Sequence, residues 1–414
     1  MALLAVGQMT ESPHARLVAC ALLTLSCACS DDAVGPAAID DTPGEVAWLA
    51  VDAGLVGSCA IADGGAAYCW GRSLLPACAG AACATPTRVP GMVASFRSVE
   101  TASQFVCGVT DAGDVYCWGK VYVGSLGDGT TLVSETPVRV AIPEPVVVVT
   151  VSFEHACALT GEGVAYCWGG IGNKLGLGGG ADRAAAPQPV ATSLRFRSIS
   201  AGTTQTCAVT AGDEGFCWGG GYGSLGVGAA DTSCAYSDAC LDTPAPMAVA
   251  GSHQWISIDA GNGFTCGVTL DHRGYCWGAI KNRDDVTLPF GVLGTGDVSG
   301  SKTPQPVAGA LQFQEIATGT RHACGVTLDG GAYCWGSNHS GELGVGFQGG
   351  SASTPQPVVG RLRFSALSAG EHTCAVSVNR NVFCWGIAAG GGLGGGTIAP
   401  GSQAFPARIL LPGP

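Results

Sequence analysis

Seven pairs of cysteines at a single spacing constrain the fold of this 414-residue chain more than any other feature. Nine residues separate the two cysteines of each pair, and the first cysteines of successive pairs lie 48 to 59 residues apart. A repeat of this length is typical of solenoids, propellers and arrays, so chain length alone does not give the number of domains. The pairs are Cys59/Cys69, Cys107/Cys117, Cys157/Cys167, Cys207/Cys217, Cys266/Cys276, Cys324/Cys334 and Cys374/Cys384.

Each repeat reads as about four short strands. An apolar strand ending in Ala-Gly or similar precedes the first cysteine, and a turn rich in Gly, Asp and Asn precedes Y/F-C-W-G. A Pro-containing strand such as residues 354–359 follows, and no helical period is visible in the repeats. We therefore predict an all-β, seven-bladed β-propeller of four-stranded antiparallel blades over residues 46–411. Six repeats also carry L-G-x-G, beginning at Leu126, Leu175, Leu225, Leu293, Leu343 and Leu393.

The two ends of the repeat region suggest how the ring closes. The first repeat begins at residues 46–54 without a Pro-containing strand before it, and residues 405–411 supply such a strand at the far end. A propeller whose N- and C-terminal strands share one blade hides its sheet edges. We predict closure of this kind.

The cysteine spacing predicts one disulfide within each hairpin. Cysteines facing each other across a turn have Cα atoms about 4.5 Å apart, which a disulfide accepts, whereas zinc sites pair cysteines two to four residues apart. Two further pairs, Cys78/Cys83 and Cys234/Cys240, would each close a short loop. In Y/F-C-W the aromatic residues point to one face and the cysteine to the other, so we expect the tryptophans to pack between neighbouring sheets.

The N-terminus predicts export. Residues 17–28 are an apolar run too short to span a bilayer, so residues 1–29 read as a signal peptide, starting at Met1 or Met9. Its end resembles the lipidation box of bacterial lipoproteins, with Cys27 or Cys29 as the acceptor. Residues 30–45 are acidic and read as a flexible linker. Removing the leader leaves 18 cysteines, an even number typical of disulfides, so we expect a lipid-anchored cell-envelope protein, or otherwise a periplasmic or secreted one.

Composition and motifs exclude several functions. The formal charge of −12 disfavours nucleic-acid binding, and the Gly-rich stretch 219–228 lacks the Lys-Ser/Thr of a phosphate-binding loop. His155, His322 and His372, each two residues before a first cysteine, read as a repeat position hydrogen-bonded to backbone rather than a metal ring. Residues 327–335 resemble the Asp-box of sialidase propellers with a one-residue difference in spacing. We expect no cofactor, no metal and no enzyme activity, with a sialidase-like glycan hydrolase as a weak alternative.

Three repeats carry unusual segments in one connection, between C-W-G and the next Pro-containing strand. These segments, 72–86, 229–243 and 279–293, should emerge on one rim, where loops on a rigid scaffold recognise partners. We predict a monomer that binds an unidentified cell-envelope or secreted protein there. A structural surface protein without a defined partner stays open as an alternative. The candidate contact residues are Tyr236, Lys281, Arg283, Asp284, Asp285 and Phe290.

The repeats resemble those of the regulator of chromosome condensation family, most clearly over residues 317–346 and 369–386. The resemblance covers about residues 46–411 and implies a seven-bladed propeller. The second cysteine of each pair departs from the usual eukaryotic repeat. The founding member of the family is a guanine nucleotide exchange factor that binds chromatin, but none of its GTPase-facing residues can be matched here, so exchange activity is implied by analogy only. Similar secreted bacterial propellers, including a beta-lactamase inhibitor, imply capture of a protein on one face.

Overall fold

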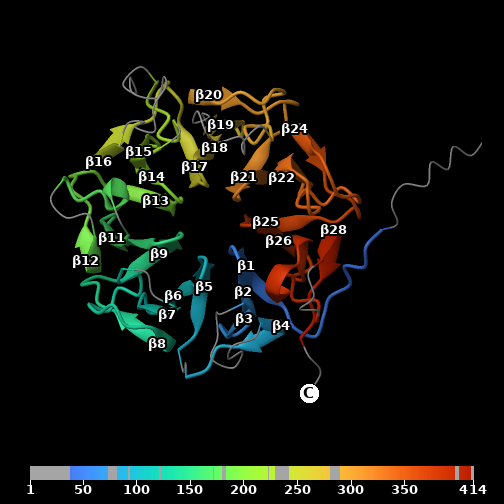
Figure 1. Ribbon diagram of the computed structural model, residues 1–414, viewed down its shortest axis with the longest axis horizontal. Coiled ribbons are helices and arrows are strands. Elements are labelled where there is room, and N and C mark those ends of the chain that lie inside the picture. The colour runs from blue at the N-terminus through green and yellow to red at the C-terminus, as the bar shows by residue number, and fades with distance from the viewer. Residues whose placement is uncertain are drawn as a thin grey trace, which may run out of the picture. The chain divides into compact units, whose positions relative to one another are not determined.

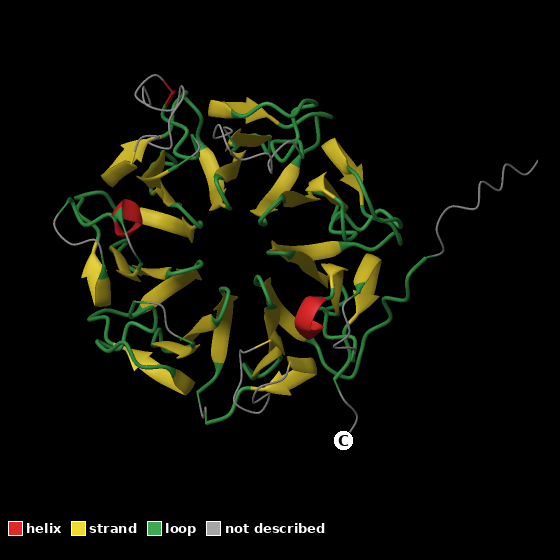
Figure 2. Cartoon of the chain, in the orientation of Figure 1, coloured by secondary structure: helices red, strands yellow, loops and turns green. Residues whose placement is uncertain are grey.

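The structure is a computed structural model, and it describes residues 38–72, 82–91, 94–120, 123–170, 172–179, 183–221, 223–228, 242–279, 290–396 and 401–411. Seven four-stranded antiparallel sheets stand around a central channel (Figures 1 and 2). The predicted all-β, seven-bladed propeller is therefore confirmed. The described residues contain no helix long and apolar enough to cross a membrane.

Each blade is built from four strands that are consecutive in the chain. The strands of blades 1 to 4 are β1 (Trp48–Ala53), β2 (Gly57–Ala62), β3 (Ala67–Arg72), β4 (Ala82–Arg88), β5 (Phe96–Thr101), β6 (Phe105–Thr110), β7 (Val115–Gly119), β8 (Ser134–Val140), β9 (Val146–Val151), β10 (His155–Thr160), β11 (Ala165–Gly169), β12 (Ala184–Pro189), β13 (Phe196–Ala201), β14 (Gln205–Thr210), β15 (Gly215–Gly220) and β16 (Asp242–Ala248).

Blades 5 to 7 follow the same pattern. Their strands are β17 (Trp255–Ala260), β18 (Phe264–Thr269), β19 (Gly274–Gly278), β20 (Ser301–Pro306), β21 (Phe313–Thr318), β22 (His322–Thr327), β23 (Ala332–Ser337), β24 (Ser351–Pro357), β25 (Phe364–Ala369), β26 (His372–Ser377), β27 (Val382–Ile387) and β28 (Ser402–Arg408). In every blade the first strand lines the channel and the fourth lies at the outer edge (Figure 1). Two short 3₁₀ turns, Asn173–Leu175 and Ala389–Gly391, lie in the connections before the outer strands of blades 3 and 7.

The predicted closure of the ring is wrong. Blade 1 consists of β1 to β4 and blade 7 of β25 to β28, so no blade takes strands from both ends of the chain. The Pro-containing strand pairs with the C-W-G strand that precedes it, as Cys384 opposite Ala407 shows in the last blade. The C-terminal strand is therefore the fourth strand of its own repeat.

The ends of the ring are joined instead by the segment before β1, which runs along blade 7 (Figure 1). The Ile39 amide donates to the carbonyl of Gly360 at 3.1 Å. The Asp41 carboxylate accepts hydrogen bonds from Ser377 Oγ at 2.6 Å and from Asn381 Nδ2 at 2.7 Å. Residues 39–42 lie within the segment predicted to be a flexible linker, and these contacts bind them to the propeller.

The seven hairpin disulfides are present, as predicted. Their Cα atoms lie 4.0 to 4.1 Å apart, closer than the distance of about 4.5 Å expected of a cross-strand pair. The bonds are Cys59–Cys69, Cys107–Cys117, Cys157–Cys167, Cys207–Cys217, Cys266–Cys276, Cys324–Cys334 and Cys374–Cys384.

The second cysteine of each pair lies next to a β-bulge, which the repeat pattern did not predict. The register between the third and fourth strands shifts between this cysteine and the glycine of C-W-G. In every blade a proline directly precedes the residue opposite the cysteine, as Pro86 precedes Thr87 in blade 1. Proline cannot donate to a strand ladder, so it is tolerated at a bulge on an outer strand. The shifts follow Cys69, Cys117, Cys167, Cys217, Cys276, Cys334 and Cys384.

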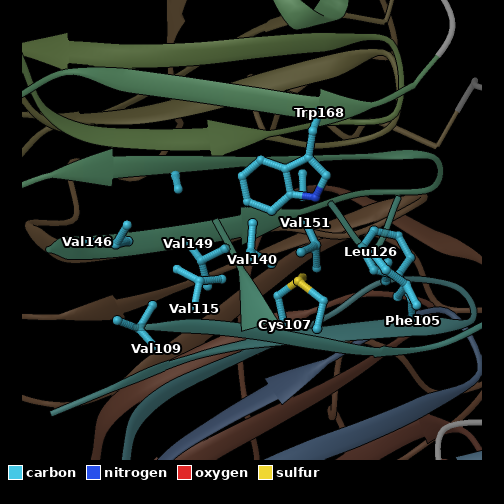
Figure 3. Close-up of a cluster of buried hydrophobic side chains, with 14 residues drawn as sticks. Phe105, Cys107, Val109, Val115, Leu126, Val140, Val146, Val149, Val151 and Trp168 are labelled. Carbon is cyan, nitrogen blue, oxygen red and sulfur yellow. A yellow bond between two sulfur atoms is a disulfide. The ribbon is translucent and has the colours of Figure 1, made fainter. Parts of the chain in front are cut away.

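Each disulfide packs in a hydrophobic cluster with the tryptophan of the following blade. Figure 3 shows one such interface, where the Cys107–Cys117 disulfide and Trp168 belong to one buried cluster. This confirms that cysteines and tryptophans point to opposite faces of each sheet.

Hydrogen bonds join the same neighbouring blades. Trp70 Nε1 donates at 2.7 Å to the carbonyl of Gly392, which comes directly before the L-G-x-G leucine of the preceding blade. Four other tryptophans donate to the equivalent carbonyl. Ser58 Oγ donates to the same oxygen at 3.1 Å and, having one proton, accepts a hydrogen bond from His372 Nε2 at 2.6 Å. The L-G-x-G loops thus join neighbouring blades through tryptophan at five of the seven interfaces, whereas Trp118 Nε1 and Trp385 Nε1 have no partner among the described residues.

The three repeat histidines bond to a side chain rather than to backbone, contrary to the prediction. Nε2 of His155 lies 2.9 Å from Thr206 Oγ1 of the next blade, and Nε2 of His322 lies 2.8 Å from Thr373 Oγ1. Burial lowers the pKa of His155 and of His322 to about 3 and that of His372 to about 4, so all three are neutral at pH 7.

A substitution at the glycine of L-G-x-G would test how tightly neighbouring blades pack. Gly394 has a φ of +67°, and a Cβ there would lie 2.9 Å from Trp70 Nε1. We predict that Gly394→Ala lowers the free energy of unfolding by about 2 to 3 kcal/mol, because it adds both backbone strain and a clash. Gly395→Ala is the matched control, since its Cβ would meet no atom within 4 Å, and it should stay within about 0.5 kcal/mol of wild type. Equal effects of the two substitutions in denaturant titrations would contradict this packing.

Candidate functional site

Most of the predicted contact residues lie outside the described residues. This holds for Tyr236, Lys281, Arg283, Asp284 and Asp285, and for Cys27, Cys29, Cys78, Cys234 and Cys240. Cys83 is described and is disulfide-bonded.

The hairpin cysteines, which the sequence marked as site residues, belong to the packing between blades and not to a binding surface. All of them are fully buried, with 0% of their surface exposed, so they cannot contact a partner. They are Cys59, Cys69, Cys107, Cys117, Cys157, Cys167, Cys207, Cys217, Cys266, Cys276, Cys324, Cys334, Cys374 and Cys384.

Phe290 is described, and it is a packing residue rather than a free contact residue. Its ring is half-buried and stands edge-on to His339 of the next blade, with the ring centres 5.3 Å apart. It also packs against the hydrophobic cluster between blades 5 and 6. A side chain used in this way between two blades has little surface left for a partner.

The connections between third and fourth strands define one face of the ring, which we call the loop face. Because every blade has the same strand order, all seven connections leave from this face. They differ in extent: 73–81 in blade 1, 221–241 in blade 4 and 279–300 in blade 5, against 338–350 in blade 6. The segments that looked unusual in the sequence therefore begin and end on a common face.

The loop face carries exposed apolar side chains. Leu132 and Val133 precede the outer strand of blade 2 and are 71% and 64% exposed, and Phe347 in blade 6 is 63% exposed. Large apolar side chains at such exposure often mark binding surfaces. Sequence reasoning missed these residues, although each stands in a connection otherwise rich in Gly, Ser and Thr.

The central channel is a second candidate site, which sequence reasoning also missed. One position in each inner strand, opposite the first cysteine of the hairpin, faces the channel. A cavity of about 250 Å³ lies there, and the described residues that line it supply carboxylates, hydroxyls and small side chains but no Lys, Arg or His. The sequence signal is an acidic or hydroxyl residue, or in one blade an alanine, directly before the Ala-Gly pair or its equivalent. These residues are Asp52, Glu100, Thr150, Ser200, Asp259, Ala317 and Ser368.

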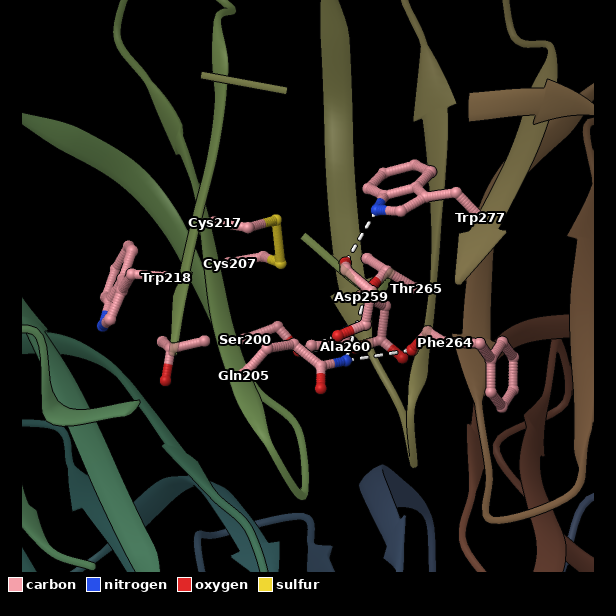
Figure 4. Close-up of a disulfide and its surroundings, with 12 residues drawn as sticks. Ser200, Gln205, Cys207, Cys217, Trp218, Asp259, Ala260, Phe264, Thr265 and Trp277 are labelled. Carbon is pink, nitrogen blue, oxygen red and sulfur yellow. Dashed lines mark hydrogen bonds between the residues drawn. A yellow bond between two sulfur atoms is a disulfide. The ribbon is translucent and has the colours of Figure 1, made fainter. Parts of the chain in front are cut away.

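Two of these carboxylates join neighbouring inner strands. Asp52 Oδ2 accepts hydrogen bonds from the amide and the hydroxyl of Thr101 in the next blade, both at 2.5 Å, while Ser368 Oγ of the preceding blade donates to Oδ1 at 2.6 Å. Asp259 repeats the pattern with Thr318, at 2.7 and 2.6 Å, and with Ser200, at 2.9 Å. Figure 4 shows Ser200 and Asp259 on the neighbouring inner strands. These aspartates therefore have a structural role.

Three acidic groups of the inner strands bind protons more readily than usual: burial raises the pKa of Asp52 despite its hydrogen bonds, and it also raises the pKa of Glu100 and Glu315. Burial, together with the charges of Asp52 and Asp259, raises the pKa of Glu100 well above its ordinary value. Burial raises the pKa of Glu315, on the inner strand of blade 6, to about 7, although its Oε1 accepts a hydrogen bond from the Leu367 amide at 2.6 Å. The channel is thus a proton-binding environment.

The described residues contain no group of three or more His, Cys, Asp or Glu side chains that could hold a metal ion. The Asp-box-like turn has a structural explanation: Asp329 Oδ1 accepts a hydrogen bond from Thr327 Oγ1 at 2.5 Å and a longer one, 3.4 Å, from the Gly331 amide. These contacts fix a hairpin tip.

The raised pKa of Glu315 predicts a pH-dependent stability. The unfolded group titrates near 4.5 and the folded group near 7, so its unfavourable contribution appears as the pH rises between these values. We predict that Glu315→Gln, which keeps an acceptor for Leu367, is more stable than wild type by about 3 kcal/mol above pH 7 and by little at pH 4.5. The neutral histidines affect both proteins alike, so the difference in unfolding free energy isolates Glu315. A difference that does not change with pH would contradict the assignment.

Comparison with known proteins agrees with the repeat assignment. The model of the "Regulator of chromosome condensation (RCC1) repeat" matches residues 112–159 and again residues 313–342. The ultraviolet-B receptor UVR8 of Arabidopsis thaliana is 32% identical over 112 residues, which are 25% of this chain and 23% of UVR8. The mouse (Mus musculus) probable E3 ubiquitin-protein ligase HERC4 is 27% identical over 112 residues, 26% of this chain and 10% of HERC4. The chain thus spans a quarter or less of the length of these relatives.

Similar solved structures are propellers of the same kind. Prp20p of Saccharomyces cerevisiae superposes with a TM-score of 0.65 at 20% identity, covering 78% of this chain and 80% of Prp20p. Human WBSCR16 superposes with a TM-score of 0.67 at 18% identity, covering 80% of this chain and 85% of its own. At these identities the similarity shows the fold alone. The two repeat matches and the seven-bladed ring together support placing this chain among the RCC1-repeat propellers.

Proposed function

We propose that this chain is an exported interaction scaffold that binds a protein partner through its loop face. The observation that carries the proposal is the combination, on one face, of connections of unequal extent with the exposed side chains of Leu132, Val133 and Phe347. Loops on a rigid ring can be shaped for a partner while the blades keep their packing. Exposed apolar anchors supply most of the binding energy in protein interfaces.

The similar propellers support protein binding as the general role. Prp20p is known for its binding to Gsp1p and histones, and Kap60 has been crystallised with it. For the present chain, exchange activity remains a family analogy. The formal charge of −12 argues against nucleic acid as the partner. We propose a non-catalytic role and a monomeric state.

The disulfides and the N-terminal segment support a location outside the cytosol. Seven disulfides within one ring are typical of an oxidising environment. We propose a bacterial cell-envelope location, with export directed by residues 1–29 and a lipid anchor on Cys27 or Cys29.

The loop-face proposal predicts which substitutions abolish partner capture. The variant Leu132→Asp/Val133→Asp/Phe347→Asp should reduce the yield of the partner in crosslinking mass spectrometry on intact cells by at least about tenfold, because it places charge at the proposed contact. The control, Phe405→Asp, changes an exposed apolar residue on the outer strand β28, outside the proposed contact, and should leave the yield unchanged. Equal recovery from wild type and both variants would favour a structural surface protein without a defined partner.

The anchor proposal predicts the mass of the mature N-terminus. We expect the N-terminal peptide to begin at Cys27 or Cys29 and to carry acyl chains, and we expect the corresponding Cys→Ser substitution to release the chain from the membrane fraction. Substitution of the other cysteine is the control and should have no effect. A mature N-terminus without acyl chains would exclude the anchor and favour a periplasmic or secreted protein.

A further inference from the structure

The turns between second and third strands project from the face opposite the loop face, which we call the hairpin face. Three adjacent blades carry an exposed apolar residue at the same position of this turn: Leu270 in blade 5, Leu328 in blade 6 and Val378 in blade 7. They are 46%, 50% and 57% exposed. Their backbone amides donate hydrogen bonds to carbonyls next to the inner strands, which fixes the tips in place.

The repeat does not require an apolar residue at this position. The other four blades have Asp63, Asp111, Gly161 and Ala211 there, which are acidic or small. The apolar tips therefore form one arc over blades 5 to 7 and are absent from the rest of the hairpin face. An arc of this kind is a local property of the surface rather than a consequence of the fold.

The N-terminal segment lies on the same arc. Ile39 binds Gly360 in the turn between blades 6 and 7, and Asp41 is held by Ser377 and Asn381, which flank Val378. Ile39 also packs against the hydrophobic cluster between blades 6 and 7. The chain that precedes residue 38 therefore departs from the hairpin face, beside the apolar tips.

The distance to the proposed anchor is short. Eight residues lie between Cys29 and residue 38, and the nine residue steps from one to the other span at most about 30 Å when fully extended. A lipid anchor on Cys29 would hold the point of departure within that distance of the bilayer. The loop face, on the far side of the ring, is the face that such a tether keeps away from the membrane.

The charges around the arc are compatible with a lipid surface. Arg273, Arg363 and Arg380 are exposed, and their ion pairs with aspartates are long, at 3.4, 3.5 and 3.6 Å. Exposed pairs of this length contribute little, so the guanidinium groups can turn to lipid phosphates while their stems lie along apolar surface. Asp271 and Asp329 lie in the same tips, and at a contact closer than the Debye length of about 8 Å their carboxylates oppose an anionic surface, so the arginines have to offset them.

We propose that the hairpin face of blades 5 to 7 rests on the lipid bilayer, with Leu270, Leu328 and Val378 inserted at the interface. The proposal deepens the proposed function and rests on it for the anchor. It identifies the hairpin face as membrane-facing and the loop face as the one presented to partners.

The test uses the chain from residue 30 onward, which contains every described residue and carries no lipid. We expect it to bind vesicles of phosphatidylethanolamine and phosphatidylglycerol in a flotation assay. The variant Leu270→Asp/Leu328→Asp/Val378→Asp should lower the partition coefficient at least about tenfold. The loop-face variant Leu132→Asp/Val133→Asp/Phe347→Asp is the matched control and should bind as wild type does.

Two results would overturn the proposal: no binding of the wild-type chain to these vesicles, or an equal loss from the hairpin-face and loop-face variants. Thermal unfolding of each variant shows whether it is folded. If the triple variant is not folded, the single substitution Leu328→Asp takes its place in the vesicle assay. Because the chain from residue 30 onward carries no acyl chain, its binding to vesicles does not depend on the anchor. The anchor is tested separately by the mass of the mature N-terminus.

Discussion

The contact between the disulfide of one blade and the tryptophan of the next is the interaction on which the propeller depends. A blade presents sulfur on one side of its sheet and indole on the other, so each interface needs one partner from each of two repeats, for example Cys107–Cys117 and Trp168. Neither the disulfide nor the tryptophan makes this contact within its own repeat. The ring closes where the last disulfide, Cys374–Cys384, packs with the tryptophan of the first C-W-G, Trp70. The L-G-x-G glycine lies against the same indole, as Gly394 does against Trp70, so this position has no room for a side chain.

Closure of the ring creates the acidic channel. Asp52, Glu100 and Asp259 belong to three blades and meet only because every inner strand faces one axis. The hydrogen bonds from Thr101 and Thr318 compensate two of these carboxylates, while Glu100 has no such donor among the described residues. Burial of acidic groups without a cation is unfavourable and is relieved by proton binding. The fold thus tolerates an electrostatic cost at its centre because the packing at seven interfaces outweighs it.

The repeat pattern was sufficient to predict the strands, the disulfides and the faces of the aromatic residues, since each of these depends on contacts within about ten residues. It was insufficient for closure, because each Pro-containing strand lies between two C-W-G strands in the chain and the pattern does not say with which of them it pairs. In the structure it pairs with the preceding one, as Cys334 opposite Gln356 shows. The packing of Phe290 was missed for the same reason, because its neighbour His339 lies in another blade. The channel acids were missed because they lie far apart in the sequence and come together only when the inner strands surround one axis.

The two faces of the ring differ in a way that the blades themselves do not determine. Both carry exposed apolar residues, so exposure alone cannot assign a membrane face and a partner face. The segment from Ile39 to Thr42 breaks this symmetry, because it binds blade 7 on the hairpin face and so fixes where the preceding chain departs. In the proposed arrangement, a rigid ring tethered on one face presents the other. The proposed orientation therefore depends on a few hydrogen bonds to Asp41 rather than on the repeats.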